Sequence, residues 1–218
     1  MVKFLPLILF LFSCSFGPGN LQSKHSTDLE TRKIRRIAVL PPSAVSSVPP
    51  AKVPLGAQVE QRASEREAPE RLAKSIYSAA VALPNWRIIS ESELREVEQS
   101  LGAVPDSARL KRIGEMVYAD AVITGRILRY RDRIGDEWGA KSPASVAFIL
   151  DLVDVRRGDV IWSARFDETQ KPLSENIFAL GEIGQRGIRW LTAEQLMEEG
   201  VKKSIGQLHQ LIGRTPTS

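Results

Sequence analysis

Histidine suits general acid–base catalysis and metal binding near neutral pH, and this sequence contains only two histidines. His25 lies in a polar amino-terminal stretch, and His209 follows Leu208 in a stretch whose apolar residues have helical spacing. These positions indicate a bystander in a tether and a residue on a helix surface rather than catalytic groups. Cys14, the single cysteine, does not supply the set of sulfur ligands that a zinc site uses. The sequence therefore predicts neither a metal site nor a cofactor.

Paired carboxylates perform acid and base chemistry without a histidine, and Asp151 and Asp154 form the candidate pair. Residues three apart on a strand point to opposite faces of a sheet, so these side chains would not converge on one substrate. A solvated strand and turn is the simpler interpretation of both residues. The sequence thus predicts no catalytic residues and a protein that is not an enzyme.

The densest basic cluster consists of Arg129, Arg131 and Arg133. Alternation along a strand places the three arginines on one face, at the end of that strand. Asp132 and its acidic neighbours offset this charge, so a solvated hairpin is the alternative to a binding surface. Trp138 follows in the predicted turn, where an exposed aromatic ring could anchor a protein partner. These residues are the first candidates for a partner-binding surface.

Three glycines, Gly181, Gly184 and Gly187, recur at even spacing in an otherwise irregular stretch. They lack the Gly-Lys-Ser/Thr ending of one phosphate-binding motif and the strand-glycine-helix context of the other. We interpret the stretch as a loop in which glycine supplies positive φ angles. This glycine loop could still line a partner site, and Gly184 at its centre is a further candidate.

The amino terminus has the order of a signal peptide. After Lys3, residues 4–12 form an apolar run that is too short to cross a bilayer, which takes about 20 apolar residues. Leu11-Phe12-Ser13-Cys14 resembles the lipobox of bacterial lipoproteins, which implies cleavage before Cys14 and acylation of that residue. A lone cysteine in an exported protein forms no internal disulfide, which also favours lipid attachment. The alternative is an ordinary secretory peptide in which Cys14 is incidental.

We expect a signal peptide over residues 1–13, a lipidated cysteine and flexible tether over 14–33, one α/β domain over 34–212, and a tail over 213–218. Five prolines within residues 41–68 predict a mobile proline-rich loop in the domain. By the resemblance to lipoproteins, Ser15 permits the outer membrane, with the domain facing the periplasm. The formal charge of +4 is weak evidence for an anionic partner, and the compartment excludes nucleic acid.

Apolar runs and alternating patterns predict strands over residues 34–40, 86–89, 119–130, 145–155 and 160–166. Helical spacing predicts helices that begin at Pro69 and after the capping residues Ser90, Asp106 and Thr192. We expect a charged turn over 131–141 and a short helix and loop over 173–189. This order of elements predicts a layered α/β sandwich, with a mixed sheet of about five strands and helices packed on it.

Three short motifs carry a resemblance to a known family: Ile37-Ala38-Val39-Leu40-Pro41, Tyr118-Ala119-Asp120-Ala121-Val122-Ile123-Thr124-Gly125 and Arg157-Gly158-Asp159-Val160-Ile161-Trp162. Over residues 34–212 the chain resembles the periplasmic lipoproteins related to the amino-terminal domain of the Tol translocation protein. The penicillin-binding-protein activator lipoprotein and the curli secretion channel lipoprotein have a similar domain. The resemblance implies the same fold and a role in binding rather than catalysis.

Three functions follow as hypotheses. The first is a membrane-anchored, non-enzymatic adaptor or assembly factor that docks an envelope protein, with the proline-rich loop and the glycine loop as candidate surfaces. The second is a subunit of a homo-oligomeric secretion channel, which needs membrane-spanning strands of about 9 to 11 residues, and we find no convincing extra pair outside the core. The third is a cell-wall hydrolase, for which Asp151 and Glu175 are the residues to substitute. The sequence favours the adaptor.

Overall fold

The structure, a computed structural model, describes residues 20–27, 29–44, 55–102, 106–136, 140–170 and 190–213, and at residues 44, 55–61, 106 and 107 it describes the backbone alone. Several predictions fall outside these ranges. They concern Cys14, Trp138, the glycine loop with Gly184, and the tail beyond residue 213. None of the helices within the described ranges has both the length and the apolar character needed to cross a membrane.

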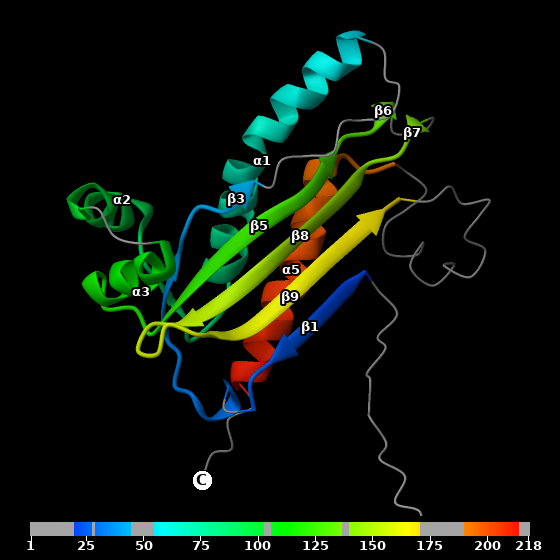
Figure 1. The fold of residues 1–218 in the computed structure, drawn as a ribbon. Coiled ribbons are helices and arrows are strands. Elements are labelled where there is room, and N and C mark those ends of the chain that lie inside the picture. The colour runs from blue at the N-terminus through cyan, green and yellow to red at the C-terminus, as the bar shows by residue number, and fades with distance from the viewer. Residues whose placement is uncertain are drawn as a thin grey trace, which may run out of the picture.

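The described chain contains both helices and strands, with a run of five strands before the last helix (Figure 1). The helical elements are η1 (Leu29–Thr31), α1 (Leu55–Val81), α2 (Glu91–Ser100), α3 (Asp106–Met116) and α5 (Ala193–Gly213). The strands are β1 (Leu21–His25), β2 (Arg36–Val39), β3 (Ser43–Ala44), β4 (Arg87–Ile88), β5 (Ala121–Arg131), β6 (Ile134–Gly135), β7 (Ala140–Ser142), β8 (Ser145–Asp154) and β9 (Val160–Thr169).

The main sheet is mixed and has seven strands, with the order β1-β9-β8-β5-β2-β4 and with β3 paired to β5 as well. β2 runs parallel to β4 and β5, whereas β5, β8, β9 and β1 pair antiparallel in succession. Pro41 and Pro42 separate β2 from β3, because proline has no N–H to donate to a neighbouring strand. The predicted α/β sandwich with a mixed sheet is therefore confirmed, with more strands than the expected five.

One face of the sheet packs against α1 and α5, which lie behind the strands in Figure 1. Alternation along the strands turns large apolar side chains toward these helices. The fully buried ones include Phe148, Leu150, Trp162 and Phe166 of the sheet, Leu72 and Ile76 of α1, and Leu196 and Leu208 of α5. α5 approaches β9 closely at Gly200, where an added Cβ would lie 2.7 Å from the ring of Phe166. The core therefore depends on a glycine at this position.

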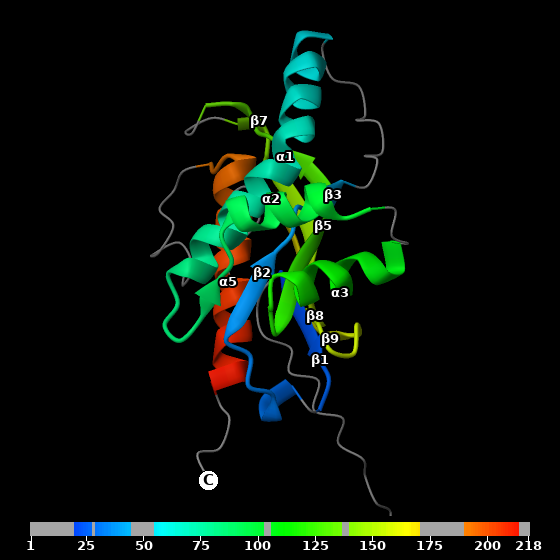
Figure 2. The same cartoon turned by 90° about the vertical axis from the view of Figure 1, so that its left-hand side faces the viewer.

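The opposite face is covered only in part among the described elements. Helices α2 and α3 lie over the start of β5 and over β2 (Figure 2). There a second, smaller core forms from Ala38, Val122, Val153, Leu94 and Ile113. Ser90 caps α2 by accepting a hydrogen bond from the Glu93 amide, as its sequence predicts. None of the described helices covers much of the second face of β5, β8, β9 and β1.

The structure corrects the boundaries of the proline-rich loop. A loop was expected over residues 41–68 with a helix starting at Pro69, but α1 begins at Leu55 and holds Pro69 in its interior. Residues 55–68 are rich in alanine, glutamine, glutamate and arginine, which favour helix. The first turns of α1 project beyond α5 in both views, so no apolar stripe is needed there and periodicity gives no signal (Figures 1 and 2).

The flexible tether expected over residues 14–33 is also wrong in its second half. β1 pairs with β9 at the edge of the sheet, and Leu29 of η1 is fully buried. Most β1 side chains are exposed, so the strand is held chiefly through its backbone and shows no apolar alternation. The turn expected over 131–141 likewise contains the short pair of β6 and β7, which extends the hairpin.

Candidate interaction surface

Both histidines make structural contacts at the surface. His25, at the end of β1, places its Nδ1 atom 3.1 Å from the carbonyl oxygen of the neighbouring Ser26. His209, on α5, places its Nε2 atom 3.0 Å from the Pro84 carbonyl oxygen and packs edge to face on Trp86, with ring centroids 5.3 Å apart. The His209 contacts hold α5 against the turn that follows α1. Among the described residues, neither ring faces a position that a substrate could occupy.

The two candidate carboxylates lie on opposite faces of β8, as predicted. Asp151 faces away from α1 and α5, with a carboxylate oxygen 3.6 Å from an Arg126 guanidinium nitrogen. Asp154 is buried, pairs with Arg32, and accepts a hydrogen bond of 2.8 Å from the Arg157 amide. Each carboxylate therefore holds a different arginine. Within the described ranges, no three His, Cys, Asp or Glu side chains come together to hold a metal ion.

The predicted arginine cluster takes part in the protein's own contacts. Arg129 forms an ion pair with Asp167, and its Nε donates a hydrogen bond of 2.6 Å to Ser145 Oγ. Arg131 is half-buried and shares a face with Arg129, because the strand register pairs these two residues with Ser145 and Ala147. Arg133 instead donates a hydrogen bond to the Trp190 carbonyl oxygen, just before α5. The three arginines therefore do not form one free basic surface.

Arg129 and Arg165 together stabilise the ionised form of the Asp167 carboxyl. Burial alone would raise the pKa of this carboxyl, but hydrogen bonds from Arg165 and Arg129 outweigh burial and lower the pKa. The Arg165 bond is 2.9 Å long. Asp167 is therefore ionised at neutral pH, and the three side chains form a fixed charged group on the sheet.

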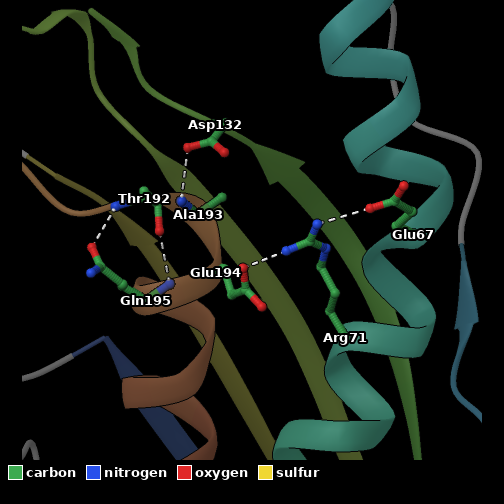
Figure 3. Close-up of polar contacts among 7 residues, drawn as sticks. All are labelled: Glu67, Arg71, Asp132, Thr192, Ala193, Glu194 and Gln195. Carbon is green, nitrogen blue, oxygen red and sulfur yellow. Dashed lines mark hydrogen bonds and ion pairs between the residues drawn. The ribbon is translucent and has the colours of Figure 1, made fainter. Parts of the chain in front are cut away.

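A polar network fastens β5, α1 and α5 together at the carboxyl end of β5 (Figure 3). Asp132 Oδ1 accepts hydrogen bonds of 3.0 Å from the Ala193 amide and 2.8 Å from the Arg133 amide. Thr192 and Gln195 form the predicted capping box, in which each side chain accepts from the other residue's amide. The amino terminus of α5 is therefore already satisfied by side chains of the protein.

Arg71 bridges the two helices in the same network. Its guanidinium donates to Glu67 on α1, at 2.8 Å, and to Glu194 on α5 (Figure 3). The hydrogen bond that Arg71 donates to Glu67 is the main cause of its raised pKa. Nearby, burial raises the pKa of Tyr130 to about 12. This end of the sheet thus has a structural role, with its charges paired inside the fold.

Among the described elements, no helix covers much of the second face of β5, β8, β9 and β1, here called the open face. In Figure 1 these strands lie in front of α1 and α5 with no labelled helix before them. The strand register aligns its side chains in rows across the sheet. The polar members are Thr124, Asp151, Ser163 and Lys24 in one row, Arg126, Arg165 and Gln22 in the next, and Arg129 with Asp167 in a third.

The charge of the open face is predominantly positive. Four of its members, Lys24, Arg126, Arg129 and Arg165, are cations, against the carboxylates of Asp151 and Asp167. The Arg126 and Arg165 side chains remain about half exposed, at 52% and 49%. Arg126, Arg165 and Lys24 were not among the residues predicted to bind a partner. The signal was present, because Arg126 and Arg165 occupy the polar positions of alternating strands.

No protein-family model matches the chain, and no curated protein matches it closely enough to count as a relative. The solved PelC dodecamer from Paraburkholderia phytofirmans is similar over 87% of this chain and 96% of its own, with 15% identity and a TM-score of 0.45.

Two further solved structures show similarities of the same order. The LpoB C-terminal domain from Salmonella enterica is 16% identical over 62% of this chain and 83% of its own, with a TM-score of 0.41. Lipoprotein GNA1162 from Neisseria meningitidis is 14% identical over 69% of this chain and 95% of its own, with a TM-score of 0.38. Similarities of this size assign neither a family nor a function, so the function has to be argued from the residues of this chain.

Proposed function

We propose that the protein is a membrane-tethered, non-enzymatic adaptor that binds another envelope protein through its open face. The observation that carries the proposal is that the strand register aligns polar and charged side chains in rows across that face. Charged side chains stand on paired strands and are fixed by ion pairs, such as Arg165 to Asp167 at 2.9 Å. A surface that is ordered before binding loses little conformational entropy on binding.

The chemistry of the face favours a macromolecular partner. Small-molecule sites are concave and lined mainly by apolar groups, whereas rows of exposed arginine and polar side chains are typical of protein contacts. Its excess of cations fits a partner surface with exposed carboxylates, which would also speed association. A catalytic role has less support, because His25, His209, Asp151 and Asp154 each contact a group of the protein itself.

The proposed attachment to the membrane is supported by the amino-terminal sequence. Lys3, the apolar run over residues 4–12 and the lipobox-like Cys14 support export and lipid attachment, and Ser15 permits the outer membrane, with the domain facing the periplasm. Three acyl chains on Cys14 would hold the protein at the membrane almost irreversibly, at about 0.8 kcal/mol per buried methylene. Cys14→Ser should move the protein from the membrane fraction to the soluble fraction of cells, whereas Ser15→Ala should leave it in the membrane. If both variants were recovered equally in the membrane fraction, lipid attachment at Cys14 would be contradicted.

The test of binding is cross-linking in cells that make the protein at its natural level. A photo-reactive amino acid replaces Arg165 on the open face or, as a matched control, the exposed Lys203 on α5. We expect a discrete heterologous protein adduct from position 165 and none from position 203. Adducts of the chain with itself alone would favour a homo-oligomer instead. Identical adducts from both positions would rule out the open face as the specific surface.

A further inference from the structure

Tyr118 combines an unusual backbone with an unusual exposure. Its φ angle is 53°, in the left-handed region that residues other than glycine and asparagine avoid. Its side chain is 83% exposed, more than the other large hydrophobic residues on the described surface, which are Val81, Met116 and Val160. The ring therefore gains little packing that would compensate for the backbone conformation. A glycine would suit this position better if stability alone decided it.

The backbone around Tyr118 is fixed by the end of α3. The Tyr118 amide donates to the Glu115 carbonyl at 3.2 Å, and the Ala119 amide donates to the Gly114 carbonyl at 2.8 Å. These two bonds form the Schellman motif, in which the left-handed residue is normally glycine. Arg36 adds a third bond, because its Nε donates to the Val117 carbonyl at 3.0 Å. Tyr118 is thus presented from a rigid helix end.

Asp120 fastens the same segment to the sheet. Its Oδ2 accepts hydrogen bonds from the Arg35 and Arg36 amides, at 2.9 and 2.8 Å, and its own amide donates to the Arg36 carbonyl at 2.7 Å. The Asp120 carbonyl accepts from the Val155 amide at 3.1 Å. Strained residues persist where the surrounding structure determines their conformation, and such positions cluster at functional sites.

The same backbone bonds bring further arginines to the segment that holds Tyr118. Arg35 is bonded to Asp120 through its amide, and the Arg87 amide donates to the Arg35 carbonyl at 2.7 Å, with Arg87 opposite Arg36 in the strand register. Arg156 follows Val155, on the other side of Asp120. Arg35, Arg87 and Arg156 are exposed, and none of the three forms an ion pair with another described residue. By contrast, the neighbouring Arg157 pairs with Asp159 at 2.9 Å.

We propose that Tyr118, Arg35, Arg87 and Arg156 form a second docking surface, here called the tyrosine–arginine end, for an acidic segment of a partner protein. Tyrosine and arginine are enriched among the residues that dominate binding energy in protein interfaces, and a ring held in place binds at a low entropic cost. Three guanidinium groups that have no ion pair among the described residues complement carboxylates on the partner. An anionic membrane would need the charges but not a rigidly presented ring. The proposal stands independently of the open face.

The test uses the full-length protein in detergent and a defined probe, a fluorescein-labelled peptide of alternating glutamate and leucine. Tyr118→Asn removes the ring but keeps a residue that tolerates the left-handed region. We expect this variant and the Arg87→Glu/Arg156→Glu variant each to weaken peptide binding at least about tenfold. Val81→Ser, at another exposed apolar residue, should leave binding unchanged. Equal affinity of Tyr118→Asn and the wild type would overturn the proposal.

Two further measurements separate the alternatives. Tyr118→Gly should raise the midpoint of thermal unfolding, by about 2 to 4 °C, while it weakens peptide binding, so a loss of binding cannot come from misfolding. Flotation with phosphatidylglycerol vesicles tests the membrane as occupant. If the tyrosine and arginine variants lose vesicle binding but keep peptide binding, the tyrosine–arginine end recognises lipid and the proposal is wrong.

Discussion

A tyrosine and nearby arginines lie at each end of β5, but the two ends differ in how far the tyrosine is exposed and in which arginines form ion pairs. At the carboxyl end Tyr130 is 3% exposed, and Arg71 and Arg133 are bound to Glu67, Glu194 and the Trp190 carbonyl oxygen. At the amino end Tyr118 is 83% exposed. Arg36 pairs there with Glu93, whereas Arg35, Arg87 and Arg156 have no ion pair with a described residue. Similar residue types therefore serve the fold at one end and remain available for a partner at the other.

The backbone is equally well fixed at both ends, so flexibility does not explain the difference. Asp132 accepts two backbone amides beside α5, and Asp120 accepts two backbone amides of the segment that enters β2. What differs is the neighbouring acidic residues. Glu67 and Glu194 neutralise Arg71, whereas Arg35, Arg87 and Arg156 lack such a partner among the described residues. Arginines that have no ion pair among the described residues, on a backbone fixed by hydrogen bonds, are available to bind a partner.

The largest difference between the ends should come from truncating each tyrosine. Tyr130→Ala removes a buried ring and should lower the free energy of unfolding by about 3 kcal/mol. Tyr118→Ala removes an exposed ring and should change it by less than about 0.5 kcal/mol. Urea unfolding followed by circular dichroism measures both. Equal losses from the two substitutions would contradict the division between the ends.

Gly114 tests whether close packing of α3 holds the amino end. An added Cβ there would lie too close to Val155 Cγ2 and 3.1 Å from Val122 Cγ2, so Gly114→Ala should cost about 2 kcal/mol of unfolding free energy. Gly206→Ala is the matched control on α5, where nothing lies within 4 Å of the added Cβ. It should instead stabilise by about 0.5 to 1 kcal/mol. Thermal melts of the two variants should therefore shift in opposite directions.

Tyr130 should make stability depend on alkaline pH. Its pKa is raised from 10.0 to about 12, so the folded state favours the neutral phenol and the unfolded chain ionises first. The stabilisation is complete below pH about 10 and is lost as the pH rises through about 12, to a total of about 2 kcal/mol. Tyr130→Phe should lack this component. Unfolding free energies of both proteins at several values between pH 9 and 12 provide the test, and parallel pH profiles would refute it.

Asp132 should have the smallest of these effects. Asp132→Ala removes the acceptor for the Ala193 and Arg133 amides and should cost about 1 kcal/mol. Asp132→Asn keeps a side-chain oxygen and should recover most of that loss. The chemical denaturation midpoints of the two variants distinguish them. If both lose the same stability, the carboxylate acts through its charge rather than as a cap.

The sequence predicts well those features that depend on neighbouring residues. Alternation predicted β5, β8 and β9, and the capping pair Thr192 and Gln195 predicted the start of α5. β1 was missed because its pairing is made by the backbone and most of its side chains are exposed. The first half of α1 was missed because its sequence has no regular apolar period. Periodicity is the main signal for an element in a sequence, so segments without it are hard to predict.

The candidate surfaces were harder to predict, because the partner of each charge is distant in sequence. Arg129 belongs to the predicted cluster, but its ion pair with Asp167 and the Arg133 bond to Trp190 come only with the fold. Arg35 and Arg156 come near one segment only in the fold, because Asp120 is hydrogen-bonded both to Arg35 and to Val155, the neighbour of Arg156. Tyr118 did give a local signal, since a bulky residue ends a helix where glycine is expected.

The adaptor role is tested most directly by reversing the charge of the open face while its cross-link is measured. A photo-reactive residue replaces Lys24, which shares this face with Ser163, and the heterologous adduct is quantified in living cells. Arg126→Glu/Arg165→Glu should reduce the adduct at least about tenfold, whereas Lys202→Glu/Lys203→Glu, with the same change in charge, should leave it intact. An adduct that survives reversal of Arg126 and Arg165, or that falls equally in both variants, would contradict binding through the open face.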